Sequence, residues 1–212
     1  SKARLVRISP EATESANDGV KEYKMTCHSG GSVDIYLEPI MPKHHLIIMG
    51  KTAIAQSLAQ MAKLLDYKVT VMAMNVTEEL FPTADELKVT FGLSKIPLSN
   101  KRYVVVCTQG EQDELALKAA LKDQTGYIAF VGSMKKRKAV FEYLRQSGIT
   151  AEALSHVRSP AGIDINAKTA PEVALSILAE IIEFSHKTQE IPVNEVIINK
   201  NDDKFYINPV CG

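Results

Sequence analysis

The feature that most constrains the fold is an alternation of short apolar runs with longer amphipathic stretches between His45 and Lys187. Four runs are apolar and rich in β-branched residues, as in strands buried on both faces: residues 46–50, 68–74, 103–107 and 127–132. Three stretches place apolar side chains at helical spacing: residues 52–65, 111–121 and 133–146. Strands that alternate with helices predict a parallel sheet covered on both faces. Because crossover connections are right-handed, we expect an α/β fold with a doubly wound, mostly parallel, Rossmann-like sheet.

The segments that flank this pattern have a different character. Residues 1–42 hold two strand-like pieces, near residues 20–25 and 33–37. Near the end of the chain, two alternating pieces surround a polar turn, which is typical of a β-hairpin. We therefore expect an N-terminal remnant at residues 1–42, a Rossmann-like domain at 43–188 and a β-hairpin tail at 189–212.

Charge and cysteine content exclude several classes of protein. The 25 Lys and Arg residues balance the 25 Asp and Glu residues, so the basic surplus of a nucleic-acid-binding chain is absent. No apolar run approaches the ~18 residues of a membrane helix, and the first residues lack the apolar region of a signal peptide. The three cysteines, an odd number, predict reduced thiols in a cytoplasmic protein.

The first candidate site is the turn GKTAIA, which begins at Gly50 after the first apolar run. A dinucleotide fingerprint requires Gly at the third position of this turn, where Thr52 stands, and an acid after the second strand, where Ala73-Met74-Asn75 stands. NAD(P) binding is therefore disfavoured. Two interpretations stay open: a plain strand-to-helix turn, or a phosphate site formed by Lys51 and the Thr52 hydroxyl at the helix N-terminus.

The second candidate site is GSMKKRK, which begins at Gly132. Ser133 suits an N-cap, and Lys135 and Lys136 lie in the first helical turn with two further cations. Cations in this position oppose the helix dipole, at about 0.3–1 kcal/mol each. A bound anion would reverse the sign of that interaction. The alternative is a solvated basic face that tolerates the repulsion.

Further candidates lie in RSPAGIDINAKTAPE, from residue 158, and in CHSGG, from residue 27. Asp164 either caps a turn or points into the crevice beside Gly132. Thr169 and Glu172 have the spacing of a capping box. Cys27 is either a reactive or metal-binding thiol in an exposed loop or an inert one. No pairing of side chains indicates an acid–base couple, so we nominate no catalytic residue.

These motifs together resemble the XdhC/CoxI family of maturation factors for molybdenum hydroxylases such as xanthine and carbon monoxide dehydrogenases. The blocks that carry the resemblance are CHSGGSVDIYLEP, YVVVCTQGEQD, YIAFVGSMKKRKAV and HVRSPAGIDINAKTAPEVALSILAEII. The resemblance implies a Rossmann-like domain that binds molybdenum cofactor, as the pterin phosphate or a dinucleotide form. It also implies that the protein is a cofactor chaperone rather than an enzyme. Such a chaperone supports sulfuration by a cysteine desulfurase and delivers the cofactor to an apo-hydroxylase.

The resemblance can be carried over residue by residue. The family's Gly-Ser-basic-basic-Lys motif falls on residues 132–136, with Met134 in place of the first basic residue, and its Pro-x-Gly-x-Asp motif ends at Asp164. The cofactor-binding residues that we expect are Gly50, Lys51, Thr52, Gly132, Ser133, Lys135, Lys136, Asp164 and Cys27. The last residues, FYINPVCG, resemble the start of a YHS-type segment, which implies Cys211 as a metal ligand.

Two other functions stay open at this point. One is an NAD(P)-dependent oxidoreductase, against which Thr52 and Ala73 argue. The other is a non-catalytic interaction domain with a vestigial crevice. We expect no nucleic-acid or membrane partner, and we consider a homodimer because residues 1–42 need a surface to cover them.

Overall fold

The computed structural model describes residues 3–12, 16–17, 20–24, 31–38, 43–93, 101–110, 112–122 and 126–189. The chain divides into two compact units, Ser1–Pro42 and Lys43–Gly212. Cys27, Cys211 and the hairpin predicted beyond Gln189 lie outside the described residues. Across those described ranges, no helix combines the length and the apolar character that crossing a bilayer requires.

The larger unit is built on a six-stranded parallel sheet with the order β7-β6-β5-β8-β9-β10. Its strands are β5 (His45–Met49), β6 (Lys68–Met72), β7 (Glu86–Lys88), β8 (Arg102–Val106), β9 (Tyr127–Phe130) and β10 (Val157–Arg158). From β5 the chain adds β6 and then β7 toward one edge of the sheet. It then returns to β8 on the other side of β5 and adds β9 and β10 toward the opposite edge. This order confirms the predicted Rossmann-like fold and places a topological switch point between β5 and β8.

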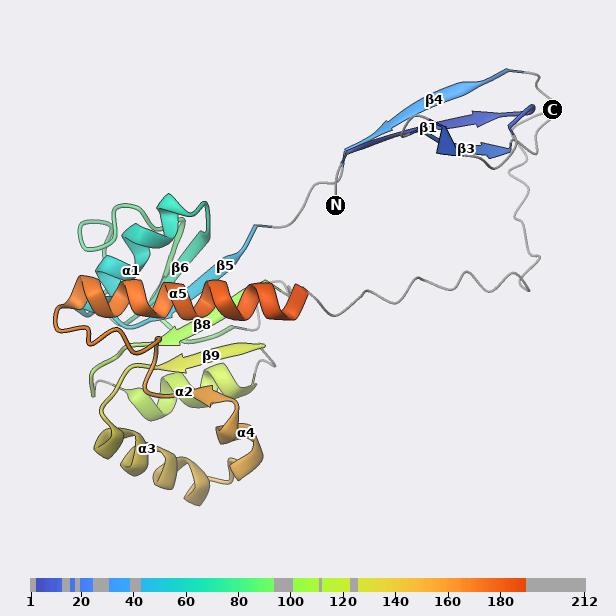
Figure 1. Cartoon of the computed structure of the whole chain (residues 1–212). Helices are drawn as coiled ribbons and strands as arrows, with labels where there is room; N and C mark the ends of the chain where they lie inside the picture. The colour runs from blue at the N-terminus through green and yellow to red at the C-terminus, as the bar shows by residue number, and fades with distance from the viewer. Residues whose placement is uncertain are drawn as a thin grey trace. The chain divides into compact units, whose positions relative to one another are not determined.

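Helices cover both faces of this sheet (Figure 1). They are α1 (Ala53–Leu64), α2 (Asp113–Lys122), α3 (Met134–Gln146), α4 (Ala151–Ser155) and α5 (Ala170–Gln189). The helices α1 and α5 pack together on one face, and α2 and α3 pack on the other. The four central strands, β5, β6, β8 and β9, contribute side chains to both cores, which explains their continuous apolar runs. In β5, Leu46 and Ile48 join the first core, and Ile47 and Met49 join the second.

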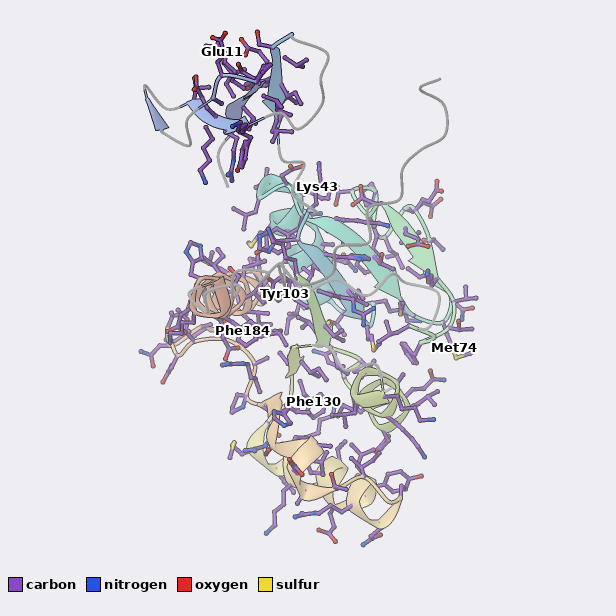
Figure 2. The ribbon with its side chains drawn as sticks, turned by 90° about the vertical axis from the view of Figure 1, so that its right-hand side faces the viewer. Glu11, Lys43, Met74, Tyr103, Phe130 and Phe184 are labelled. Carbon is purple, nitrogen blue, oxygen red and sulfur yellow. The ribbon has the colours of Figure 1, made fainter. Side chains whose placement is uncertain are left out.

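Aromatic side chains extend the first core toward the amino ends of the strands. Figure 2 shows Phe184 of α5 near Tyr103 of β8, and their ring centroids are 6.4 Å apart. Tyr127 of β9 lies 5.3 Å from Phe184. In the same region His44 pairs with the Tyr103 hydroxyl at 2.8 Å. These ring contacts lie near the amino ends of the strands and belong to the scaffold of the sheet.

The smaller unit contains a four-stranded sheet with the order β2-β3-β1-β4. Its strands are β1 (Arg4–Ser9), β2 (Ala16–Asn17), β3 (Val20–Lys24) and β4 (Val33–Leu37). Strands occur at both places where the sequence predicts them, β3 and β4. The prediction missed β1, which pairs parallel with β3 and antiparallel with β4.

Candidate cofactor site

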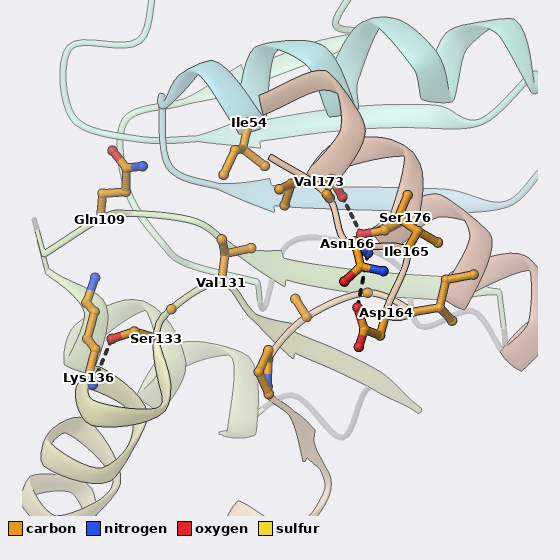
Figure 3. Close-up of a pocket in the computed structure, with 16 residues that line it drawn as sticks. Ile54, Gln109, Val131, Ser133, Lys136, Asp164, Ile165, Asn166, Val173 and Ser176 are labelled. Atoms are coloured by element: carbon orange, nitrogen blue, oxygen red, sulfur yellow. Dashed lines mark hydrogen bonds between the residues drawn. The ribbon is translucent and has the colours of Figure 1, made fainter. Parts of the chain in front are cut away.

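The carboxyl ends of the sheet strands open into a cavity of about 910 Å³. One wall is the start of α3, with Gly132, Ser133 and Lys136, and the other is the loop of residues 160–167 (Figure 3). Apolar side chains line the space between the walls, among them Ile54 and Val131. The cavity lies where open α/β sheets bind their ligands.

The α3 wall begins with the N-cap that the sequence predicts. Ser133 has extended backbone angles, φ −65° and ψ 158°, and its hydroxyl accepts a hydrogen bond from the Lys136 N–H at 3.3 Å. Gly132 precedes it, and a Cβ at this position would lie 3.2 Å from the Phe130 ring. A side chain here would make a tight contact with this ring, so the Phe130 ring would have to shift by a few tenths of an ångström.

The basic residues of α3 do not act as one cluster. Lys136 reaches back to α2, where its Nζ lies 2.6 Å from Oδ2 of Asp113, whose side chain is only 3% exposed. Oδ1 of Asp113 accepts hydrogen bonds from the Thr108 hydroxyl and from the Gly110 N–H. Asp113 thus compensates the charge of this lysine within the chain, an arrangement that differs from both alternatives considered from the sequence, a bound anion and a solvated basic face.

Lys135 lies on another face of the helix. Successive helical residues point about 100° apart, so Lys135 lines a separate depression with Arg137 and Lys138, and the cavity receives only Lys136. The prediction that both lysines face one crevice needs this correction. The sequence could not reveal Asp113 as a partner, because the contact joins two helices.

The opposite wall is held in place by a buried carboxylate that the sequence analysis missed. Glu180 of α5 is 8% exposed, and it accepts hydrogen bonds from the Tyr127 hydroxyl and the Gly162 N–H, both at 2.8 Å. Arg158 pairs with its other oxygen at 3.1 Å. Burial, reinforced by the Glu180 charge, raises the pKa of Tyr127, so this hydroxyl remains a donor. An acid on the apolar face of VALSILAEII was the available signal.

Gly162 itself has no room for a side chain. Its φ is +90°, and a Cβ would lie 2.3 Å from the Ser176 hydroxyl oxygen. This close approach lets the loop pass over α5 and brings the next residues to the cavity.

Asp164 fulfils both of its predicted alternatives. Its Oδ1 accepts a hydrogen bond from the Asn166 N–H at 3.1 Å, and both residues line the cavity (Figure 3). Asn166 adopts φ 56°, an uncommon conformation that favours short polar side chains.

At the start of α5, the predicted capping box is confirmed: the Glu172 N–H donates to the Thr169 hydroxyl at 3.4 Å, and the Thr169 N–H donates to the Glu172 carboxylate at 2.9 Å. Donation from the Lys168 N–H, followed by that from Thr169, lowers the pKa of Glu172.

The first candidate turn is divided between two cavities: Ile54 lines the larger one, and the first two residues of the turn line another. Gly50 and Lys51 line a smaller cavity of about 350 Å³, together with Ala73, Met74, Asn75, Phe91, Thr108 and Gln112. Gly50 has φ +132°, and a Cβ there would lie 2.3 Å from the Cys107 carbonyl oxygen, so only glycine fits. The Lys51 ammonium donates to the Met74 carbonyl at 3.3 Å.

Thr52 lines neither of these two cavities. It caps α1 with φ −73°, and its hydroxyl accepts from the Ala55 N–H at 3.3 Å. The third position of the turn is thus filled without backbone strain.

Cys107 is fully buried behind this turn, as expected for a packing residue. Burial raises the pKa of the Cys107 thiol to about 12, although contact with the Thr52 hydroxyl acts in the opposite direction. Among the residues that the structure describes, no group of His, Cys, Asp and Glu is arranged to hold a metal ion.

Several known proteins are similar to this chain over its larger unit. Residues 46–181 match the family described as the XdhC Rossmann domain. A protein of Bacillus subtilis described as a probable subunit of xanthine dehydrogenase is 29% identical, over 74% of this chain and 47% of that protein. The molybdenum cofactor insertion chaperone PaoD of Escherichia coli is 24% identical, over 66% of this chain and 40% of its own length. An uncharacterised E. coli protein, YqeB, is 26% identical over 74% of this chain and 30% of its own length.

The fold is also found in a solved structure. A crystal structure described as a xanthine dehydrogenase from Bacillus halodurans superposes with a TM-score of 0.60 at 23% identity, covering 79% of this chain and 49% of the other. This chain thus spans less than half of the length of each of these relatives. Because the family match covers most of the larger unit, the chain belongs to the XdhC family through its Rossmann domain.

Proposed function

We propose that this chain binds molybdenum cofactor in the cavity between α3 and the loop of residues 160–167, and that it serves the maturation of a molybdenum hydroxylase. The observation that carries the proposal is the cavity itself, with Lys136 on one wall and Asp164 on the other (Figure 3). Family membership supports it, as do the functions named for two relatives, a molybdenum cofactor insertion chaperone and a probable xanthine dehydrogenase component.

The residues that line the cavity fit this cofactor. A volume of about 910 Å³ lies within the usual range for small-molecule sites. The Lys136 ammonium, together with the positive end of the α3 dipole, would hold a phosphate. Ile54, Val131 and Val173 offer apolar surface to a flat ring, and the Asp164 carboxylate offers an acceptor to ring N–H groups.

The pairing of Lys136 with Asp113 gives the cavity a property that suits a carrier. A phosphate would share the ammonium with a carboxylate that is already 2.6 Å from it. The net gain on binding is therefore smaller than for an unpaired lysine, since part of the attraction is already satisfied. A protein that must release its ligand to another protein benefits from such moderate affinity.

When bound, the cofactor supplies the molybdenum centre at which a hydroxylase later works. The chain's own residues bind and orient the pterin end and shield it from water. In this proposal the chain is a cofactor chaperone and not an enzyme. Its partners are an apo-hydroxylase of the xanthine or carbon monoxide dehydrogenase type and a cysteine desulfurase that sulfurates the bound cofactor.

The form of the cofactor is also part of the proposal. The pterin phosphate form needs only the larger cavity. A dinucleotide form would extend toward the smaller cavity beside Gly50 and Lys51, which lies across the switch point. An NAD(P)-dependent oxidoreductase remains the second candidate because the strand order is that of dinucleotide-binding sheets. Thr52, which caps α1 where a pyrophosphate would approach, disfavours it.

The test is to express the chain in a host supplied with molybdate, purify it, and measure bound molybdenum, phosphorus and pterin fluorescence. We expect pterin and phosphorus to co-purify, and to be lost in an Ile163→Glu variant, which adds a negative charge to the cavity wall. Ile163 is 41% exposed, so this change should leave the fold intact. A wild-type protein without pterin that instead binds NADH would contradict the proposal and favour the oxidoreductase.

A further inference from the structure

The outer face of α3 carries a second recessed surface, separate from the cavity. We call it the α3 groove, and its lining residues are Met134, Lys135, Arg137, Lys138, Phe141 and Arg145. Its volume is about 660 Å³. We propose that the α3 groove docks an acidic segment of a partner protein, in which carboxylates surround one bulky apolar side chain. This inference goes beyond cofactor binding and does not require it.

The charge of the groove is one-sided. Four of its six lining residues are cations, and none is an acid. In the part of the chain that the structure describes, Lys135, Arg137 and Lys138 form no ion pair, whereas Arg145 pairs with Glu142 at 2.9 Å. The first turn of α3 also contains no acid, so these cations face the positive end of the helix dipole uncompensated. Carboxylates from outside the chain would satisfy both the cations and the helix terminus.

The floor of the groove is apolar and adaptable. Met134 is 59% exposed at its entrance, and Phe141 is 8% exposed at its base. Residues 134, 138, 141 and 145 follow helical spacing, so they lie along one face of α3. The Arg137 guanidinium covers the Phe141 ring, with 5.1 Å between its Cζ and the ring centroid. An exposed, unbranched methionine is typical of surfaces that accept a protruding apolar side chain.

Other anionic partners fit this surface less well. Nucleic acid favours exposed aromatic faces for base stacking, but the Phe141 ring is buried and covered by Arg137. A membrane surface requires an apolar face that inserts, and Met134 is the one large apolar side chain exposed in this groove. A peptide segment can combine several carboxylates with one apolar anchor, which matches the four cations of the groove and its exposed Met134 side chain.

The test uses the full chain and a fluorescein-labelled 12-residue peptide that contains alternating Glu residues around one central Phe. A second peptide replaces this Phe with Ser. Binding is followed by fluorescence anisotropy at low ionic strength. The test variant is Lys135→Glu/Lys138→Glu, and the matched control is Lys118→Glu/Lys122→Glu on α2, which changes the net charge equally but lies outside the groove. A third variant, Met134→Ser, removes the exposed apolar side chain of the groove without touching a buried residue.

We expect the Phe-containing peptide to bind the wild-type chain and the α2 control equally, and the groove variant about tenfold more weakly. Met134→Ser and the Phe-free peptide should each reduce binding severalfold. The proposal is overturned if no peptide binds, if both double variants weaken binding equally, or if removal of Phe has no effect. It is also overturned if an RNA oligonucleotide or an anionic vesicle binds more tightly than the peptide and loses binding in the groove variant. Because no cofactor is present, a negative result would leave the proposed function standing.

Discussion

Replacement of Lys136 by alanine should destabilise the fold as well as weaken ligand binding. Its ammonium lies 2.6 Å from Asp113, whose side chain is 3% exposed, so the variant leaves a buried carboxylate without its cation. Breaking a buried pair costs about 3–5 kcal/mol. Lys136 is 28% exposed, and Asp113 keeps its hydrogen bonds from Thr108 and Gly110. We therefore expect a loss of about 2 kcal/mol in the free energy of unfolding.

A double-mutant cycle isolates this interaction. In an Asp113→Asn background, Lys136→Ala should cost only about 0.5 kcal/mol, the value of the ammonium's contact with the Phe130 ring, whose centroid is 5.6 Å away. The coupling energy is then about 1.5 kcal/mol, which urea unfolding followed by circular dichroism can resolve. Lys135→Ala, on the exposed face, serves as control and should change stability by less than about 0.5 kcal/mol. A coupling energy of zero within error would refute the role assigned to Asp113.

Three further predictions follow from buried or crowded residues. Gly50→Ala should lower the free energy of unfolding by at least about 2 kcal/mol, because its Cβ would meet a carbonyl oxygen at 2.3 Å. Gly148→Ala is the control: with φ +88° but open space around it, it should cost about 1 kcal/mol, and equal losses in thermal melts would count against the steric argument. Glu180→Gln should cost about 2–3 kcal/mol and speed hydrogen exchange in residues 160–167, whereas the exposed Glu183→Gln should do neither. Burial lowers the pKa of His45 to about 4, so as pH falls from about 6.5 toward 4 the unfolded chain binds a proton that the folded chain does not. The free energy of unfolding should therefore decline by up to about 3 kcal/mol over this pH range, and a His45→Gln variant with the same pH slope would contradict this.

The fold followed from sequence because its signals are local. The apolar run of β5 and the helical spacing of α1 can each be recognised within about a dozen residues, and the right-handed crossover then favours a doubly wound sheet. The elements that were missed carry little signal: β7 has three residues and β10 has two. In the smaller unit, β1 was missed because its residues RLVRIS do not alternate strictly between apolar and polar, and only Val6 among them is buried.

The candidate site could be predicted only in part, because some of its contacts join residues that are distant in the sequence. The N-cap at Ser133 and the capping box at Thr169 depend on neighbours in sequence, and both were predicted. The partners Asp113 and Glu180 act across the fold, and no local pattern pairs them with Lys136 or Gly162. The direction in which each lysine of α3 points depends on how the helix docks on the sheet. Tertiary packing therefore decided which predicted residues share one cavity.

The most direct test of the account is a titration of the full chain with molybdenum cofactor, followed by pterin fluorescence, on the wild type and on two charge variants. Among the residues that the structure describes, Lys136 is the one cation that lines the cavity, and Lys136→Gln removes it. Lys135→Gln removes its exposed neighbour with the same change in net charge. The account predicts that Lys136→Gln weakens binding about tenfold or more and that Lys135→Gln changes it less than about twofold. Equal affinity in all three proteins, or a loss with Lys135→Gln alone, would contradict a site in this cavity.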